Sequence, residues 1–412
     1  MTSSSQASPH DFDPFLVLPP PLRAIQRLPA WGITFLLPIF LAVILVATAL
    51  DGTVGGSSDF RPIQDIKTAL GLGQPPPTPA SFPFLRDFTS MALLCAVVAT
   101  SVVVHLQWKL FATCISGLMT SGALTPRQAP LFRRHHRLLR IDRAGSEFQS
   151  FIGRTNSRLA RWGDFSFLIV LAACGIATIF VVGLQHVGLF RILTPRPYSE
   201  NNPAIFSHNA YNNWWASINH VWGVITYGGL AAFEVCLMLW QNIVGVFAVY
   251  IAVALPAYYE YSLDPLVPAD NYGWGPLATA FRTVRLSLAI HAFMITILLV
   301  VINIRIWIWT IVPFCTWLFA VCLYLPVPWA VFRHVKGEWQ RRRRAEMQSS
   351  FMSMSEADRL AAEASLVEIV KSVKLRPLSR QPVLTLTFAA TILLPIVLTI
   401  VQIVVPLRFG PH

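Results

Sequence analysis

Long uninterrupted runs of apolar residues constrain this chain more than any other feature of its sequence. Seven of these runs reach about 20 residues, which is the length a helix needs to cross the hydrocarbon of a bilayer. Only 13% of the 412 residues are charged, about half of the roughly 25% that soluble chains use to cover their surface. Most of the surface must therefore face lipid. The sequence predicts an all-α, polytopic transmembrane helix bundle of about seven spans.

The predicted spans are separated by polar or proline-containing segments. Their expected bounds are 31–50, 88–107, 165–187, 218–240, 286–304, 309–334 and 384–407. A further apolar segment, 243–255, follows the fourth span almost without a break. We expect this segment to extend the fourth helix over 218–256, because an eighth crossing would move the most basic loop to the opposite side of the membrane.

The distribution of lysine and arginine predicts how the chain is threaded. With the N-terminus inside, 25 of the 32 basic residues fall on the cytoplasmic side and seven on the outer side. Basic loops are retained in the cytoplasm during insertion, so we predict that the N-terminus lies inside and the C-terminus outside. The net charge of +12 follows from this asymmetry and does not indicate a nucleic-acid partner. The predicted outer loops carry no Asn-x-Ser/Thr sequence, and we expect a bacterial inner (plasma) membrane.

The chain divides into four predicted parts. Residues 1–30 include three consecutive prolines and are expected to form a disordered cytoplasmic lead. Residues 31–334 hold six spans, with a cytoplasmic helical loop over 108–164. Residues 335–383 form a basic cytoplasmic loop with an amphipathic helix, and 384–407 form the last span.

One acidic residue, Glu234, falls inside a predicted span. An ionisable group is costly in hydrocarbon and tends to face the bundle interior or water. Under the predicted topology His105 and His291 both lie near the cytoplasmic face, and a carboxylate beside two imidazoles can relay protons or hold a cation. The leading hypothesis is therefore a channel- or transporter-like bundle with these three residues along an ion or proton path. A structural hydrogen bond of Glu234 is the alternative.

Four histidines at span ends support a second hypothesis, a haem-binding membrane redox protein. His105 and His291 would lie near the inner face, and His186 and His220 near the outer face. A two-haem cytochrome of b type needs two axial imidazoles for each iron. Such proteins usually place two histidines on one helix, whereas each helix here has one, so haem is the weaker hypothesis. We expect no other cofactor and no metal site. Enzymatic activity stays uncertain, with a non-enzymatic role favoured, because no catalytic or nucleotide-binding motif is present.

A run of four arginines supports a third hypothesis, a non-catalytic scaffold with cytoplasmic helices that bind lipid or a protein partner. The run precedes the amphipathic segment 355–375 and could hold the headgroups of anionic lipids. A simple topology anchor is the alternative. A homo-oligomer is compatible with all three hypotheses. The four residues are Arg341, Arg342, Arg343 and Arg344.

A tryptophan pair lies just before the fourth span, and a segment that contains proline and glycine follows that span. Together they form a further pattern. Its residues are Trp214, Trp215, Leu263, Pro265, Asp270, Gly273 and Leu277. The segment 214–277 resembles a group of uncharacterised bacterial multi-pass membrane proteins whose cytoplasmic segment is of the type His-Pro-Asp-x-x-Gly-Gly. Here Pro268 and Ala269 replace the His-Pro pair, and Trp274 replaces the second glycine. The resemblance implies membrane character, and it draws attention to a tight turn at Asp270 and Gly273. The tryptophan pair suits an interfacial aromatic belt.

Overall fold

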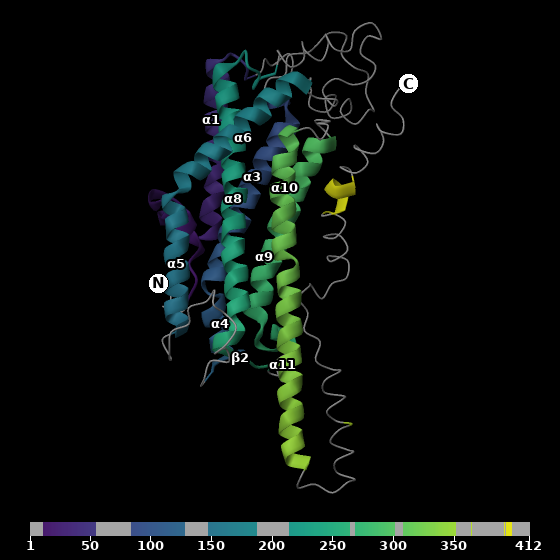
Figure 1. The fold of residues 1–412 in the computed structure, drawn as a ribbon. Coiled ribbons are helices and arrows are strands. Elements are labelled where there is room, and N and C mark those ends of the chain that lie inside the picture. The colour runs from purple at the N-terminus through teal and green to yellow at the C-terminus, as the bar shows by residue number, and fades with distance from the viewer. Residues whose placement is uncertain are drawn as a thin grey trace.

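The computed structural model describes residues 11–54, 84–127, 147–187, 214–263, 268–300 and 308–351, and a few positions beyond them (364, 391 and 393–397). Over these residues the chain is a bundle of long helices (Figure 1), which confirms the predicted all-α class. Within the described residues, five helices are long and apolar enough to cross a membrane, or six if a helix pair bent by 50° is counted as one span. This is compatible with a multi-pass membrane protein. The seventh predicted span, 384–407, lies almost entirely outside the described residues.

Long helices make up the bundle; most of them are roughly parallel to one another, and α6 lies at a slant across them (Figure 1). They are α1 (Leu36–Leu50), α3 (Phe88–Ala112), α6 (Ser166–Val187), α8 (Val221–Tyr258), α9 (Gly275–Val300), α10 (Ile308–Tyr324) and α11 (Pro326–Phe351). The other described α-helices are α4 (Cys114–Thr120), which is short, and α5 (Glu147–Asp164). The described 3-10 helices are η1 (Pro14–Val17), η2 (Pro20–Arg27), η3 (Ala30–Phe35), η4 (Phe84–Arg86) and η5 (Pro268–Gly273).

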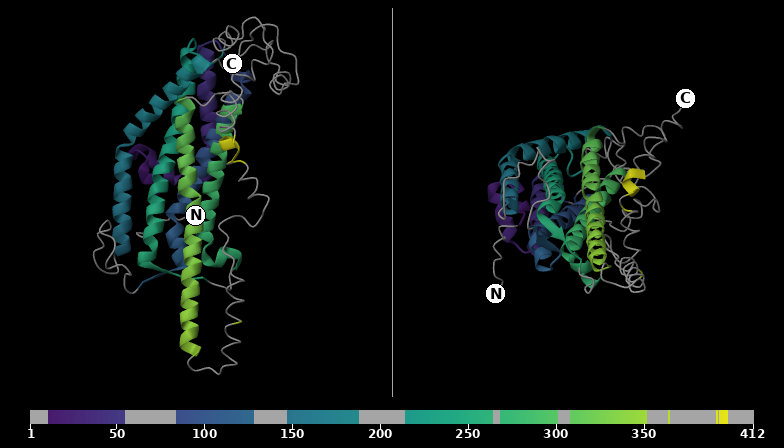
Figure 2. Two further views of the ribbon diagram at one scale, coloured as in Figure 1. Left: turned by 45° about the vertical axis from the view of Figure 1, so that its right-hand side comes forward. Right: turned by 60° about the horizontal axis from the view of Figure 1, so that its bottom comes forward.

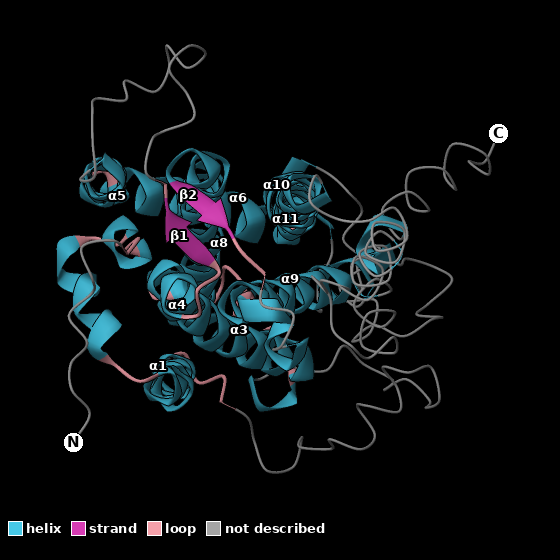
Figure 3. Cartoon of the chain, turned by 90° about the horizontal axis from the view of Figure 1, so that it is seen from below, coloured by secondary structure: helices cyan, strands magenta, loops and turns pink. Residues whose placement is uncertain are grey.

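Two short strands mark one end of the bundle. Strands β1 (Leu124–Pro126) and β2 (Tyr259–Tyr261) pair antiparallel, with Leu124 opposite Tyr261. They lie across the end of the bundle beside α8 (Figure 3). Helix α11 extends past the other helices at this same end (Figure 2). We call it the basic end, because α11 carries the four-arginine run there, and we call the opposite end the distal end.

The outer surface of the long helices is apolar. The side chains of Val46 in α1, Phe167 in α6 and Val253 in α8 are 61%, 72% and 73% exposed, respectively. A helix that is apolar around its whole circumference fits either a large protein core or a membrane. Since these side chains lie on the outside of the bundle, the exposure favours a lipid environment.

Helix α8 is the central element of the bundle. It is one continuous helix of 38 residues, about 57 Å long at 1.5 Å per residue, and it has no break over 243–255, where an eighth crossing would have to begin. Gly245 lets α8 pack closely against α10, because any residue with a side chain would place its Cβ atom only 2.6 Å from the ring of Tyr324. The length of α8 allows one helix to reach from the distal end to β2.

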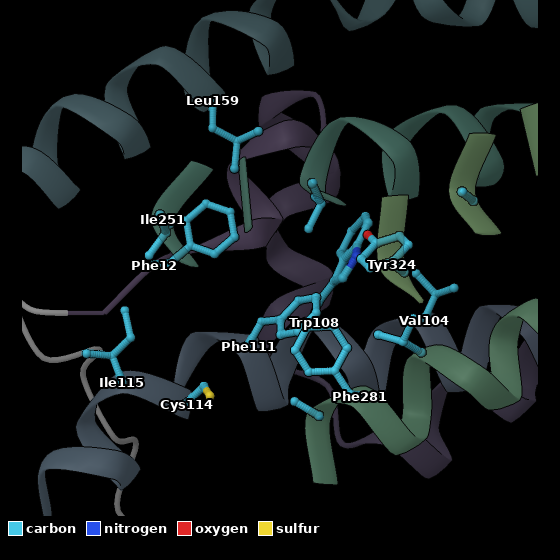
Figure 4. Packing of buried hydrophobic residues seen from close by; sticks show 14 of the residues in the cluster. Phe12, Val104, Trp108, Phe111, Cys114, Ile115, Leu159, Ile251, Phe281 and Tyr324 are labelled. Carbon is cyan, nitrogen blue, oxygen red and sulfur yellow. The ribbon is translucent and has the colours of Figure 1, made fainter. Parts of the chain in front are cut away.

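A disordered lead was expected over 1–30, and the part of it that the structure describes, residues 11–30, contains η1 and η2. From residue 11 onward the chain packs against α3, α5 and α8, whereas residues 1–10 lie outside the described residues. Phe15 and Val17 are 1% and 0% exposed, and Phe12 belongs to the same buried cluster as Leu159 of α5 and Ile251 of α8 (Figure 4). These apolar side chains supply the burial that orders the segment.

The prolines of this segment form helical turns instead of preventing them. Pro20 is the first residue of η2 and Pro14 the first of η1. Proline suits these positions because its φ is already fixed in the helical range and the first turn needs no N–H donor. The side chain of Asp13 caps η1 by accepting a hydrogen bond from the backbone N–H of Phe15.

Three other boundaries differ from the expected ones. Helix α9 begins at Gly275, so Arg282 and Arg285 lie within a helix and not in a loop before the expected span 286–304. The expected cytoplasmic loop over 108–164 contains α4, β1 and α5, and 128–146 lie outside the described residues. Helix α11 continues to Phe351, so the first part of the expected basic loop is helical.

Candidate functional site

A cavity of about 130 Å³ lies inside the bundle. Side chains from α1, α3, α6, α8, α9 and α10 line it, and nearly all of them are apolar or aromatic. Glu234 from α8 and His291 from α9 also line it, and they are the acid and the base of the described lining. Glu234 lies 13 residues after the start of α8, about 20 Å along the helix axis. Both groups therefore lie well inside the apolar part of the bundle.

Glu234 and His291 contact each other directly. Oε1 of Glu234 lies 3.0 Å from Nε2 of His291, and their side chains are 13% and 2% exposed. The contact is close but is not aligned as a hydrogen bond, so both carboxyl oxygens and Nε2 lack a hydrogen-bond partner among the described residues. Buried polar atoms are normally paired. This pair therefore keeps unused hydrogen-bonding capacity at the wall of a cavity.

The surroundings of His291 determine how many protons the pair holds. Nδ1 of His291 lies 2.9 Å from the backbone carbonyl of Ser287. A carbonyl can only accept, so Nδ1 carries its proton and the neutral imidazole presents a lone pair at Nε2. That lone pair would repel the carboxylate oxygen 3.0 Å away unless one of the two atoms is protonated. The geometry therefore fits a pair that shares one proton and has no net charge.

A cluster of uncharged polar side chains lies between this pair and the basic end. The amide of Gln241 donates to Oγ of Ser287 (2.7 Å) and to Oε1 of Gln107 (3.3 Å). The hydroxyl of Tyr324 donates to the backbone carbonyl of Gln241 (2.6 Å). Gln241 follows Glu234 by seven residues and Ser287 precedes His291 by four, so each lies on the same helix face as its ionisable neighbour. The cluster continues the polar face of both helices away from the cavity.

Sequence reasoning missed this cluster. Glutamine and serine carry no charge and did not stand out within apolar runs. The spacing of Gln241 from Glu234 and of Ser287 from His291 is the signal that was available, because residues four and seven apart share a helix face.

His105 lies away from the Glu234–His291 pair and does not line the cavity. Its Nε2 donates to the backbone carbonyl of Leu28 (3.0 Å), which also accepts a hydrogen bond from the side chain of Lys109. Its ring makes an edge contact with Phe15. His105 therefore attaches the N-terminal segment to α3, and of the three residues expected on one path the structure brings together two.

The remaining histidines of the haem hypothesis lie toward the distal end or outside the described side chains. His220 is the residue that precedes α8, and the side chain of His186 is not described. Nδ1 of His291 faces the backbone carbonyl of Ser287 and Nε2 lies 3.0 Å from Glu234, so ligation of an iron by Nε2 would require Glu234 to move away. Within the described part of the chain, no three His, Cys, Asp or Glu side chains are grouped as metal ligands.

Another buried acid, Asp87, is hydrogen-bonded to two residues of the cavity lining, Ser90 and Trp215. Its Oδ2 accepts hydrogen bonds from the indole N–H of Trp214 (2.7 Å), the indole N–H of Trp215 (3.0 Å) and the hydroxyl of Ser90 (2.6 Å). Its Oδ1 accepts from the backbone N–H of Ser90 (2.9 Å), which caps α3. Trp215 and Ser90 also line the cavity. The tryptophan pair is thus fully buried and does not form the expected interfacial belt.

The loop between α8 and α9 contains the predicted tight turn. Gly273 has a φ of +89°, and Asn271 and Tyr272 also have positive φ. The carbonyl of Gly273 accepts a hydrogen bond from the hydroxyl of Ser121 (2.7 Å). Asp270 lies in η5, and its side chain is outside the described residues. The turn holds the start of α9 against α4.

An ion-pair network lies at the basic end. Glu338 of α11 contacts the guanidinium groups of Arg127 (2.7 Å) and Arg342 (2.6 Å), and Arg342 also contacts Glu260 of β2 (2.9 Å). Beside it is a cavity of about 750 Å³ that Arg333, Lys336 and Arg341 also line. Within the four-arginine run, Arg343 pairs with Glu346, and Arg341 and Arg344 are exposed.

Comparisons with protein-family models, with curated proteins and with solved structures found no match.

Proposed function

We propose that this protein is a channel- or transporter-like membrane protein in which the Glu234–His291 pair binds and releases one proton. The observation that carries the proposal is the unsatisfied, buried contact between these two groups at the wall of the cavity. Removing an isolated carboxylate from water costs on the order of tens of kcal/mol, so the group takes up a proton or finds a counter-charge. An imidazole beside it can accept that proton and return it.

The polar cluster supports a route for the proton toward the basic end. Gln241 lies about 10 Å beyond Glu234 along α8, and its neighbours Gln107, Ser287 and Tyr324 carry groups that can donate or accept. We propose that the basic end faces the cytoplasm of a bacterial inner membrane, with the N-terminus inside, because basic residues are retained on that side.

The test is proton flux into liposomes that contain the purified full-length protein. An imposed potential drives the flux, and a pH-sensitive dye trapped inside reports it. We expect flux in the wild type and its loss in Glu234→Gln, which keeps the shape of the side chain but cannot exchange a proton. Glu346→Gln makes the same chemical change at an exposed position of α11 and is expected to leave the flux unchanged. A Glu234→Gln variant with undiminished flux would show that the site is wrongly assigned.

A second proposal concerns the cavity at the basic end. Arg127, Arg333, Lys336 and Arg341 give its lining an excess of positive charge over Glu338, and the proposed orientation places it where the phosphates of anionic lipids lie. We expect the double variant Arg333→Gln/Arg341→Gln to retain less phosphatidylglycerol through detergent purification than the wild type does. Arg343→Gln, outside this lining, is the matched control. Equal lipid retention in all three proteins would leave the arginine run as a topology anchor only.

A further inference from the structure

The cavity beside Glu234 has more room than a proton needs. Its volume is about 130 Å³, which is close to that of a cavity of about 150 Å³ that can hold benzene. The space therefore suits one small organic molecule of about six non-hydrogen atoms. The question is which chemical class fits the walls.

The walls select for an apolar body. Three aromatic residues line the cavity, Phe84, Trp215 and Tyr227, together with Met238, Met294 and several aliphatic side chains. Rings of this kind attract a cation held against their faces. Among the described lining residues none is a lysine or arginine, and a charge on His291 would be neutralised by Glu234, so this lining offers no free counter-charge to an anion.

The one ionisable pair in the lining selects for a positive head group. Both oxygens of Glu234 lack hydrogen-bond partners within the described chain. An ammonium group supplies N–H donors to these oxygens as well as a positive charge, and charge-assisted hydrogen bonds of this type are the strong ones. A neutral molecule of the same shape lacks the charge, and a carboxylate would be repelled.

We propose that the cavity binds a small organic ammonium ion in exchange for the proton of the Glu234–His291 pair. The proposal rests on the proposed function and names the substrate class of the same site. In an apolar cavity the state without net charge is strongly favoured. The pair with one proton is neutral, and the pair without that proton is neutral only when a monovalent cation is beside it. When the ammonium ion enters, the shared proton leaves Oε1 or Nε2 for water, so the charge in the cavity stays constant.

The test uses isothermal titration calorimetry on the full-length protein in detergent, with tert-butylammonium as the probe. tert-Butanol has the same shape without the charge, and pivalate has the opposite charge. Titration in two buffers of different protonation enthalpy counts the protons released. We expect tert-butylammonium to bind with about one proton released per ligand, and its affinity to fall about tenfold per unit decrease in pH while the pair is protonated. We expect no binding of tert-butanol or pivalate.

Two variants and one control complete the experiment. Glu234→Gln removes the counter-charge, and Ala231→Leu fills part of the cavity without changing either ionisable group. We expect both to lose tert-butylammonium binding, whereas Glu346→Gln binds as the wild type does. Size-exclusion chromatography and thermal unfolding verify that each variant is folded.

The outcomes separate this inference from the proposed function. If proton flux depends on Glu234 but tert-butylammonium does not bind, the substrate class is wrong and the proton site stands. Binding of tert-butanol as tight as that of tert-butylammonium would reduce the cavity to an apolar void, and binding without proton release would refute the exchange. If neither flux nor binding depends on Glu234, both proposals fail.

Discussion

Two buried acids near one cavity differ in how completely their hydrogen-bonding capacity is used: Glu234 lines the cavity, and Asp87 is bonded to the lining residues Ser90 and Trp215. Asp87 accepts four hydrogen bonds, from two indoles, one hydroxyl and one backbone N–H. Glu234 faces only His291, and neither of its oxygens has a well-aligned donor among the described residues. A saturated carboxylate has no capacity left for a ligand, whereas an unsaturated one does. Burial of an acid is therefore not itself a sign of function. The hydrogen bonds of the carboxyl group distinguish a structural acid from one that can bind a proton or a ligand.

The backbone reinforces this difference. Asp87 is the residue that precedes α3 and caps it, and a negative charge at a helix N-terminus is further stabilised by the helix dipole. Glu234 lies inside α8, where all nearby backbone N–H groups are used by the helix itself. The fold thus stabilises the charge of Asp87 and leaves the charge of Glu234 dependent on a proton or a ligand.

The largest expected effect is on stability at Asp87. Asp87→Ala leaves two buried indole N–H groups without acceptors and removes the cap of α3, and each loss costs about 1–3 kcal/mol. We expect the free energy of unfolding to fall by about 3–5 kcal/mol, measured by denaturant titration in detergent. Glu234→Gln is the counterpart and is expected to change this free energy by less than about 1 kcal/mol. Equal destabilisation by both substitutions would remove the distinction between the two acids.

The next effect concerns the packing that holds α8 in place below the cavity. A Cβ atom at Gly245 would meet the ring of Tyr324, whose hydroxyl is fixed on the carbonyl of Gln241. We expect Gly245→Ala to destabilise the protein by about 1–3 kcal/mol through overpacking. Gly229→Ala on the same helix meets no atom within 4 Å and is expected to be neutral or to stabilise by up to about 1 kcal/mol. A neutral Gly245→Ala would show that α8 and α10 are not closely packed there.

A smaller effect tests the polar cluster. Ser287→Ala removes the hydroxyl that bonds Gln241 and Gln107 but leaves the backbone carbonyl that faces His291. We expect a loss of about 1 kcal/mol in stability and a slower proton flux in liposomes. Thr296→Ala on the same helix is the control, since its hydroxyl bonds only its own helix. An unchanged flux in Ser287→Ala would separate the cluster from the proton route.

The smallest expected effect is on the pH dependence of stability at a third acid, Asp13. Its carboxyl group accepts fewer hydrogen bonds than that of Asp87, but unlike that of Glu234 it has an aligned donor, the backbone N–H of Phe15. Burial raises its pKa, although the hydrogen bond from Phe15 and the charge of Arg23 oppose the shift. An acid with a raised pKa binds its proton more tightly in the folded state. The stabilisation that this proton binding gives the folded state is therefore present at low pH, and it is lost as the pH rises through the pKa of Asp13 in the folded protein. We expect Asp13→Asn, which retains the cap, to stabilise by less than about 1 kcal/mol at neutral pH and not at about pH 3. Stabilisation that is independent of pH would contradict this account.

The sequence predicted the helical bundle and the pair Glu234 and His291, but not Asp87 or the polar cluster around Gln241. Apolar runs report spans directly, and an acid such as Glu234 within a run stands out. His105 was grouped with it only because depth in the membrane can be counted along a helix, whereas the direction in which a side chain faces cannot. Asp87 was missed because it lies at the boundary of a span, and its role depends on Trp214 and Trp215, which are more than 120 residues away. Contacts between distant segments are set by packing, and a single sequence does not encode them in a readable pattern.

The central claim is that Glu234 exchanges a proton inside the bundle while Asp87 does not. Infrared difference spectroscopy during a pH titration of the full-length protein tests this most directly. We expect one reversible carboxyl signal that is absent in Glu234→Gln and shifts when tert-butylammonium is added. Identical titrating signals in the wild type and in Glu234→Gln would contradict the claim.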